Sequence, residues 1–474
     1  MPKIYSSLIE IKSALQRAEI TVQGLVKIYL SEIKKNVHLN AFNEVFEEEA
    51  LILAKNVDNR IKDGTAGKLA GMVIAIKDNI CYKGHQVSAS SRILKDFTSI
   101  YSSTIVERLL AQDAVIIGRC NCDEFAMGGS NETSYYGPVK NHADQTKVSG
   151  GSSGGSAVAV QANMCLAAIG TDTGGSVRQP ASFCGVIGLK PTYGRISRHG
   201  IIAYASSFDQ VGTITRSIED AAILLEVMAG VDEYDSTLAQ IPVTSFQVTT
   251  QKPSKKKIAY LQEALSSPGV DAEVKSTLVT YIDKLRADGH TVKPIAFEQL
   301  DYMVPAYYIL ATAEASSNLA RFDGVHYGYR SPGANDLQST YKKSRSEGFG
   351  KEVKRRIMLG TFVLSAGYYD AYYAKAQKVR RLIREKTDQI LNEYDFILVP
   401  TAPEPAYSIG KQEKDPVVVY LSDIFTVQAS LTGAPAISLP CGNNSKGLPL
   451  GLQLLTKNFN EQELLTFSKY FLKL

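Results

Sequence analysis

Two turns rich in glycine and serine, at 150–156 and 174–176, constrain this chain more than any other part of its sequence. Between them lie a helix-sized apolar segment at 157–160 and a strand-sized apolar segment at 165–169. Glycines permit positive backbone angles, so several N–H groups of such a turn can point at one spot. The pattern is typical of backbones that bind a phosphate or stabilise an oxyanion, and both interpretations are open at this point.

Strand-like and helix-like patterns alternate around these turns. Short apolar runs typical of buried strands lie at 72–76, 115–117, 165–169, 258–261, 396–399, 436–439 and 450–454. Apolar residues at helical spacing lie at 22–33, 46–61, 104–110, 271–287, 302–321, 351–364 and 368–394. We therefore predict an α/β fold with a mixed, largely parallel central sheet covered by helices on both faces.

The polar stretch at 236–257 is the best internal boundary, and the late strands complete the sheet that begins before it. We predict a single domain over 1–474 with these parts: N-terminal helices at 1–62, a core at 63–235, a linker at 236–257, a mostly helical insertion or cap at 258–395, and a segment at 396–474 that completes the core.

Composition excludes several classes of protein. Hydrophobic residues make up 44% and charged residues 21% of the chain, as in a soluble globular protein. The sequence contains no apolar run long enough to span a membrane and no signal peptide, so we expect a cytoplasmic protein with no membrane contact. The net charge of +4 is too small to argue for a nucleic-acid surface. The six scattered cysteines are expected to be buried thiols, and no metal site is predicted.

Two segments look like familiar motifs, but the residues in or around them exclude both interpretations. Residues 64–68 lack the spacing of a phosphate-binding loop. Residues 150–154 match the G-x-S-x-G pattern of a serine hydrolase elbow, but the preceding segment 140–149 is polar, whereas an elbow follows a buried strand. No histidine has a distinctive setting, so we reject a Ser-His-Asp triad. Serine chemistry with another base remains.

Lys77 is the candidate base, because it ends the apolar run at 72–76. A lysine acts as a base only where desolvation favours its neutral form. The neighbouring Asp78 would oppose this by stabilising the ammonium group. In strand geometry, however, adjacent side chains point to opposite faces of a sheet.

Lys77, the turn at 150–156 and the run at 174–178 together resemble the amidase signature family. The resemblance implies a Ser-Ser-Lys triad: Ser176 is the nucleophile that forms the acyl-enzyme, Ser152, on a cis peptide bond, relays its proton, and Lys77 is the base. Ser153 is expected to be structural. The oxyanion hole implied by the family consists of the N–H groups of Thr173, Gly174, Gly175 and Ser176.

Within this family, the chain is similar to the branch of glutamine-hydrolysing subunits of tRNA-dependent amidotransferases. The similar segments are 307–308, 313–324, 354–357, 367–373 and 421–426. The resemblance implies that Arg356 binds the α-carboxylate of glutamine, Asp423 binds its α-ammonium group, and Tyr307 lines the pocket. Arg355 is an alternative carboxylate ligand, because adjacent residues of a helix face different ways.

This resemblance also implies partners. Two other subunits would complete a heterotrimer, in which one partner uses ATP and magnesium and binds most of Glu-tRNA(Gln), while this chain has no cofactor and releases ammonia from L-glutamine. The first alternative is a free-standing amidase that acts on small amides. The second is a non-enzymatic nucleotide-binding or scaffold protein, which would leave Lys77 and Ser176 without a role.

Overall fold

The computed structural model describes residues 4–249, 251–411 and 420–474. Its strands form one sheet of 11 strands in the order β1-β3-β2-β4-β6-β5-β10-β11-β9-β7-β8. The strands are β1 (Phe42–Val45), β2 (Val73–Lys77), β3 (Val115–Cys120), β4 (Ala167–Asp172), β5 (Ile187–Lys190), β6 (Gln210–Thr215), β7 (Lys257–Leu261), β8 (Thr291–Ile295), β9 (Phe396–Pro400), β10 (Ala436–Asn443) and β11 (Pro449–Leu455).

Helices precede, separate and follow these strands. They are α1 (Leu8–Gln16), α2 (Val22–Lys35), α3 (Glu47–Lys62), α4 (Thr104–Ala111), α5 (Gly154–Gln161), α6 (Arg178–Cys184), α7 (Ile218–Met228), α8 (Glu263–Ser266), α9 (Ala272–Ala287), α10 (Leu300–Asn318), α11 (Leu337–Gly348), α12 (Lys351–Val363), α13 (Lys375–Glu393), α15 (Val427–Thr432) and α16 (Glu461–Phe471). Every strand and helix predicted from the sequence has a counterpart here. The elements that the sequence did not predict include β1, β5, β6 and α11.

The mixed α/β class is confirmed, but the expectation of a largely parallel sheet is wrong. Among the described strands, six of the ten neighbouring pairs are antiparallel. The four parallel pairs form two groups, β3-β2-β4 and β9-β7-β8. Antiparallel strands, including β5 and β6, join the two groups into one sheet.

The unpredicted strands β5 and β6 each contain a glycine that disguises their pattern. A Cβ atom on Gly188 of β5 would lie 2.6 Å from the Cβ of Ala181 in α6. A Cβ atom on Gly212 of β6 would lie 2.4 Å from the Leu189 carbonyl oxygen. Glycine weakens a strand signal, yet here it lets α6 and a neighbouring strand approach closely. Close packing against α6 and between strands therefore requires glycines, and these glycines weaken the sequence pattern by which β5 and β6 could be predicted.

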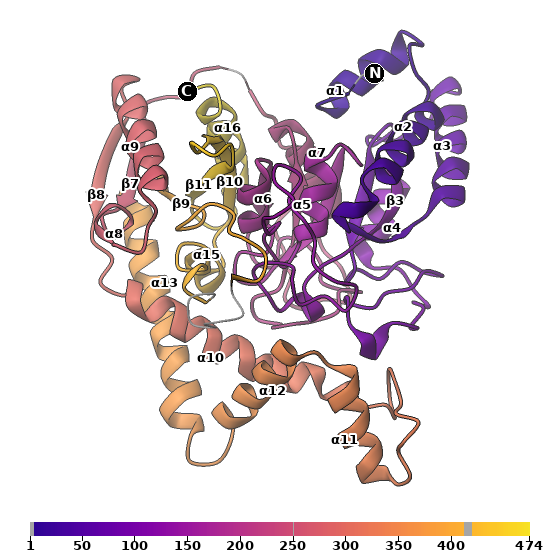
Figure 1. The fold of residues 1–474 in the computed structure, drawn as a ribbon. Coiled ribbons are helices and arrows are strands. Elements are labelled where there is room, and N and C mark those ends of the chain that lie inside the picture. The colour runs from indigo at the N-terminus through magenta and orange to yellow at the C-terminus, as the bar shows by residue number, and fades with distance from the viewer. Residues whose placement is uncertain (1–3, 250, 412–419) are drawn as a thin grey trace.

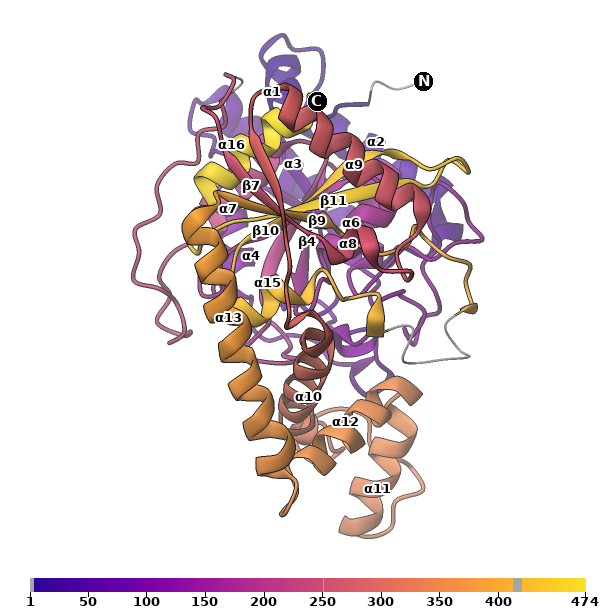
Figure 2. The same ribbon diagram turned by 90° about the vertical axis from the view of Figure 1, so that its left-hand side faces the viewer.

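Helices cover both faces of the sheet, as predicted. The Gln453 side chain of β11 accepts a hydrogen bond from Arg178 at the start of α6, so alternate residues of β11 face α6. On the other face, Phe467 of α16 stacks on Phe396 of β9 with ring centroids 4.5 Å apart. Figure 2 shows the strands fanned by their twist between these helices.

The later helices extend beyond the sheet. Figure 1 shows α10, α12 and α11 running below the body of the molecule, with α13 returning from them to β9. β7 and β8 belong to the sheet itself, so within 258–395 the part outside the sheet begins after β8. The division of the chain into five parts otherwise stays a prediction. No helix in the described ranges is both long and apolar enough to cross a membrane.

Candidate active site

The two glycine-rich turns meet at one edge of the sheet. β2 and β4 are parallel neighbours, so Lys77, which ends β2, and Asp172, which ends β4 and leads into the turn at 173–177, lie at the same end of the sheet. Ser152 and Ser153 stand immediately before α5, which packs against β2 and β4. The topology therefore brings together three segments that are far apart in sequence.

Lys77 is fully buried and contacts the first of these turns directly. Its Nζ donates hydrogen bonds to Ser152 Oγ at 2.7 Å, to Ser153 Oγ at 2.9 Å and to Thr171 Oγ1 at 3.0 Å. Asp78 turns away, as strand geometry predicts, and pairs with Arg119. Among the described residues, no carboxylate lies within ion-pair distance of Lys77.

Burial lowers the pKa of Lys77 to about 8, since desolvation disfavours the ammonium form. The negative potentials of Cys122, Asp123 and other acidic groups around it oppose this shift only in part. Lys77 therefore has an accessible neutral state near physiological pH, which is what a general base needs.

Ser152 and Ser176 are held by their main chains. The Gly151–Ser152 peptide bond is cis, as the resemblance implied. The Ser153 N–H donates to the Ser176 carbonyl at 3.1 Å, which ties the two turns together. The Ser176 side chain stands at the site surface, at 8% exposure, and its hydroxyl has no hydrogen-bond partner among the described residues. That hydroxyl is free to meet a substrate.

An ion pair braces the turn that carries Ser176. Asp172 Oδ1 accepts from Arg178 Nη2 at 2.8 Å and from the Gly175 N–H at 2.9 Å, while Oδ2 accepts from Arg178 Nε at 3.0 Å. Both side chains are fully buried, and a bidentate pair of this kind fixes the geometry of the turn.

Of the predicted oxyanion donors, the Gly175 N–H is bound to Asp172 in this structure. Within the described residues, the N–H groups of Thr173, Gly174 and Ser176 have no acceptor. The Thr173 hydroxyl donates to Asp209 at 2.7 Å, which fixes the first of them. The predicted donors that are free to donate to a ligand here are therefore Thr173, Gly174 and Ser176, and the membership of the oxyanion hole stays a prediction.

The three predicted substrate-binding residues gather beside this turn. A Cβ atom on Gly174 would lie 2.5 Å from the Tyr307 hydroxyl, so Tyr307 of α10 packs directly on the turn. Asp423 is joined to it through Thr426, whose hydroxyl donates to the Gly174 carbonyl at 2.6 Å and to the Asp423 carbonyl at 3.0 Å. Burial raises the pKa of Asp423 to about 7.

The structure separates the two candidate arginines on α12. Both arginines pair with Glu352, and the Arg356 Nε donates to its Oε1 at 2.9 Å; the Arg355 side chain is 40% exposed, whereas only 4% of the Arg356 side chain is exposed. Arg356 donates to Tyr204 Oη at 2.9 Å and lies over the ring of Tyr308 at 5.3 Å. Arg356, not Arg355, points into the site.

Sequence reasoning missed several side chains that shape the site. Tyr308 donates to Asp423 Oδ2 at 2.8 Å, and Tyr420 stacks on Tyr308 with centroids 4.0 Å apart. Tyr204 lies 152 residues before Arg356 in the sequence. Thr426 lies 252 residues after Gly174, whose carbonyl it binds. Tyr308 could have been found from its place next to Tyr307. Tyr204 and Thr426 carry no local signal.

This geometry combines a serine hydroxyl without a hydrogen-bond partner, a buried amine of lowered pKa and unpaired N–H groups, which are the groups that acyl transfer from an amide requires. A family model described as Amidase matches residues 24–465. The chain therefore belongs to the amidase family.

Individual relatives are more specific. A glutamyl-tRNA(Gln) amidotransferase subunit of Chlorobium phaeobacteroides is 50% identical over 464 residues, covering 97% of both chains. The crystal structure of the corresponding glutamyl-tRNA(Gln) amidotransferase subunit from Thermotoga maritima superimposes with a TM-score of 0.78 at 38% identity, covering 94% of this chain and 90% of that one. A peptide amidase from Stenotrophomonas maltophilia has a TM-score of 0.81 at 28% identity, covering 98% and 95%.

Proposed function

We propose that this chain hydrolyses L-glutamine through an acyl-enzyme on Ser176 and is the glutaminase subunit of a tRNA-dependent amidotransferase. The observation that carries the proposal is the pair Arg356 and Asp423 beside the catalytic turn, a guanidinium group and a carboxyl group that is ionised above its pKa of about 7. An amino acid zwitterion needs this combination, and a guanidinium group matches a carboxylate bidentately. The similarity to glutamyl-tRNA(Gln) amidotransferase subunits supports the same conclusion.

In the proposed mechanism, neutral Lys77 takes the proton that Ser152 receives from Ser176 as Ser176 Oγ attacks the side-chain amide carbon. Negative charge develops on the amide oxygen, which the N–H groups of Thr173, Gly174 and Ser176 stabilise by about 3 kcal/mol for each donor. Collapse of this intermediate breaks the carbon–nitrogen bond and returns a proton to the departing ammonia. Water then hydrolyses the ester, which yields glutamate and restores the Ser176 hydroxyl.

Ammonia released here would pass to a partner subunit that activates Glu-tRNA(Gln) with ATP and magnesium, in a heterotrimer of which this chain is one member. The weak net charge of +4 suits a chain that is not the main tRNA-binding subunit. ATP chemistry belongs to the partner in this scheme, and the steps above use only residues of this chain.

The test is ammonia release from L-glutamine by the purified chain, alone and with its partner subunits. Ser176→Ala should abolish release, and Ser276→Ala, an exposed serine of α9, should leave it unchanged. An analogue of glutamine without the α-amino group separates the alternatives, because a site that uses Asp423 discriminates against it. Hydrolysis of simple amides with no activity on glutamine would instead establish a free-standing amidase.

A further inference from the structure

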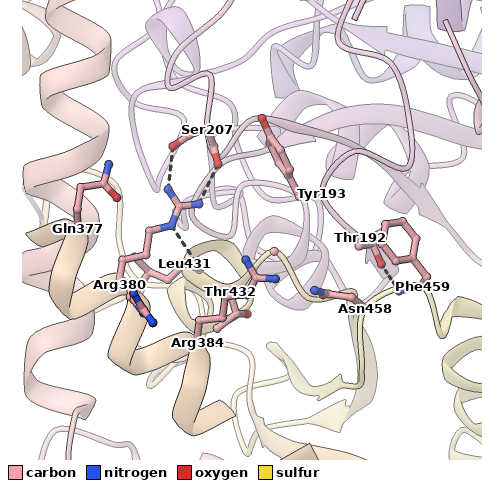
Figure 3. A pocket seen from close by; sticks show the side chains of 12 residues that line it. Thr192, Tyr193, Ser207, Gln377, Arg380, Arg384, Leu431, Thr432, Asn458 and Phe459 are labelled. Carbon is pink, nitrogen blue, oxygen red and sulfur yellow. Dashed lines mark hydrogen bonds between the residues drawn. The ribbon is translucent and has the colours of Figure 1, made fainter. Parts of the chain in front are cut away.

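A second cavity lies away from the triad, between α13, α15 and the segments that follow β5 and β11. Its volume is about 470 Å³, within the range of small-molecule sites. Three arginines of α13 line it, Arg380, Arg381 and Arg384, and no acidic side chain of the described residues does. Figure 3 shows Arg380 on one side of the cavity and Arg384 pointing toward Asn458.

On α13, Arg384 is four residues from Arg380 and three from Arg381, so it is a neighbour of both on the helix surface. The helix as a whole carries six basic and three acidic side chains. Arg381 pairs with Glu385 at 2.7 Å and Arg384 with Asp388 at 3.8 Å, and both pairs are exposed. Such pairs contribute little, so either guanidinium group can exchange its partner for a ligand.

Arg380 is the innermost of the three. Its Nε donates to the Leu431 carbonyl at 2.9 Å, and its Nη1 and Nη2 donate to Ser207 Oγ at 2.9 Å and the Ser207 carbonyl at 3.0 Å. It stacks on Phe208 at 4.1 Å. Within the described residues it has no carboxylate within ion-pair distance. Glu314 of α10 acts on it only from beyond that distance. A largely buried cation with no carboxylate in direct contact is costly, so an anion in the cavity would offset that cost.

The rest of the lining offers two aromatic rings and an unsatisfied acceptor. Tyr193 and Phe459 are half-buried at the wall, and the buried Asn458 Oδ1 has no hydrogen-bond partner among the described residues. Aromatic faces stack on planar groups, and a free amide oxygen accepts from an N–H or a hydroxyl. We propose that this cavity binds a phosphate group carried by a nucleotide, either free or within an RNA chain, with the arginines on the phosphate.

The cavity is connected to the active site without being part of it. Ser207, which Arg380 binds, also donates two hydrogen bonds to the carboxylate of Glu314 in α10. Its N–H donates at 2.8 Å and its hydroxyl at 2.5 Å. Two residues further on, Asp209 accepts from Thr173 of the oxyanion turn. Phosphate binding is independent of glutamine hydrolysis, so it can be tested even if the proposed function fails.

Isothermal titration calorimetry on the full chain at low ionic strength tests the proposal, with inorganic phosphate, AMP, ATP and a short single-stranded oligoribonucleotide as probes. At least one probe should bind with saturation. Tighter binding of the free nucleotides or of the oligoribonucleotide identifies the source of the phosphate. Arg384→Gln should weaken binding about tenfold, which corresponds to about 1.4 kcal/mol, because it removes a charged hydrogen-bond donor from the phosphate. Arg381→Gln combined with Arg384→Gln should weaken it further.

The matched control is Lys378→Gln, which removes the same charge from an exposed position of α13 outside the cavity lining. It should change affinity by less than about twofold, because exposed charges are screened. Equal loss in the control and in Arg384→Gln would show non-specific attraction to a basic helix and overturn the proposal. Saturable binding by none of the four probes would overturn it as well. Circular dichroism and the melting temperature establish that each variant is folded.

Discussion

The proposed catalytic triad and the proposed glutamine-binding residues are built by different parts of the molecule. Lys77, Ser152 and Ser176 lie on turns at the end of the sheet and are held by main-chain hydrogen bonds and the buried Asp172–Arg178 pair. Arg356 and Asp423 come from α12 and from the segment before α15, outside the sheet. They are held by side chains, namely Tyr204 and Glu352 for Arg356 and Tyr308 for Asp423.

This difference assigns the rate of amide attack to one region and the choice of amide to the other. A triad fixed by backbone and buried charge is preorganised for one reaction, the attack on an amide. A pocket made of side chains on helices selects which amide is attacked, and can change without disturbing the triad. Variants of the first region should therefore lower kcat, and variants of the second should raise KM.

The largest effect is expected for Lys77→Met, which keeps the volume of the side chain but removes the base. We expect kcat for glutamine to fall about 10³-fold, the typical contribution of general base catalysis. The control is Lys190→Met, because Lys190 is a second fully buried lysine that contacts the Pro191 carbonyl and neither serine. Steady-state ammonia release measures both, and similar losses in the two variants would contradict the role of Lys77.

The second effect concerns the two arginines of α12. Arg356→Lys loses the planar fork that matches a carboxylate, so KM for glutamine should rise about 100-fold with little change in kcat. Arg355→Lys, at an exposed position next to it, should stay within about twofold of the parent because an exposed pair contributes little. Kinetics on the two variants decide between them, and a larger KM effect at Arg355 would reverse the assignment.

The pH dependence of kcat/KM should show both regions at once. The base must be neutral and Lys77 has a pKa of about 8, while the ammonium ligand must be ionised and Asp423 has a pKa of about 7. With rising pH, log kcat/KM should climb with a slope of about two below pH 7, about one between 7 and 8, and then level off. Asp423→Asn should remove the lower transition and keep the upper one. Loss of the upper transition in that variant would contradict the assignment of Lys77.

The triad could be proposed from the sequence because its residues lie in two compact motifs and at the end of an apolar strand, a pattern that resembles the amidase signature family. It could not show that Asp172 captures the Gly175 N–H, since that bond depends on a buried ion pair with Arg178. Tyr204 was beyond reach as well, because its contact with Arg356 spans 152 residues and exists only through packing.

The fold was also predictable only in part: its helices and apolar strands could be predicted, but the directions of its strands could not. Long periodic helices and apolar strands such as β2 and β9 carry strong local signals. The direction of a strand relative to its neighbours is not a local property of the sequence. In β5 and β6, glycines required by the close approach of α6 and the neighbouring strand weaken the strand pattern. The predicted share of parallel pairs was too high for this reason.

The smallest effect on kcat is expected for Ser153→Ala, which tests whether Ser152 alone, and not Ser153, relays the proton. Both hydroxyls accept from Lys77, at 2.7 Å for Ser152 and 2.9 Å for Ser153. Ser153→Ala removes one acceptor that stabilises the ammonium form, so the upper transition should move to lower pH by about one unit. Its plateau kcat should stay within about threefold of the parent, because general acid–base contributions of about 10²-fold or more need a group in the proton path. Ser152→Ala, which breaks that path, should lower the plateau about 10³-fold on the same scale. An equal loss of plateau kcat in the two variants would place Ser153 in the relay and end the distinction between them.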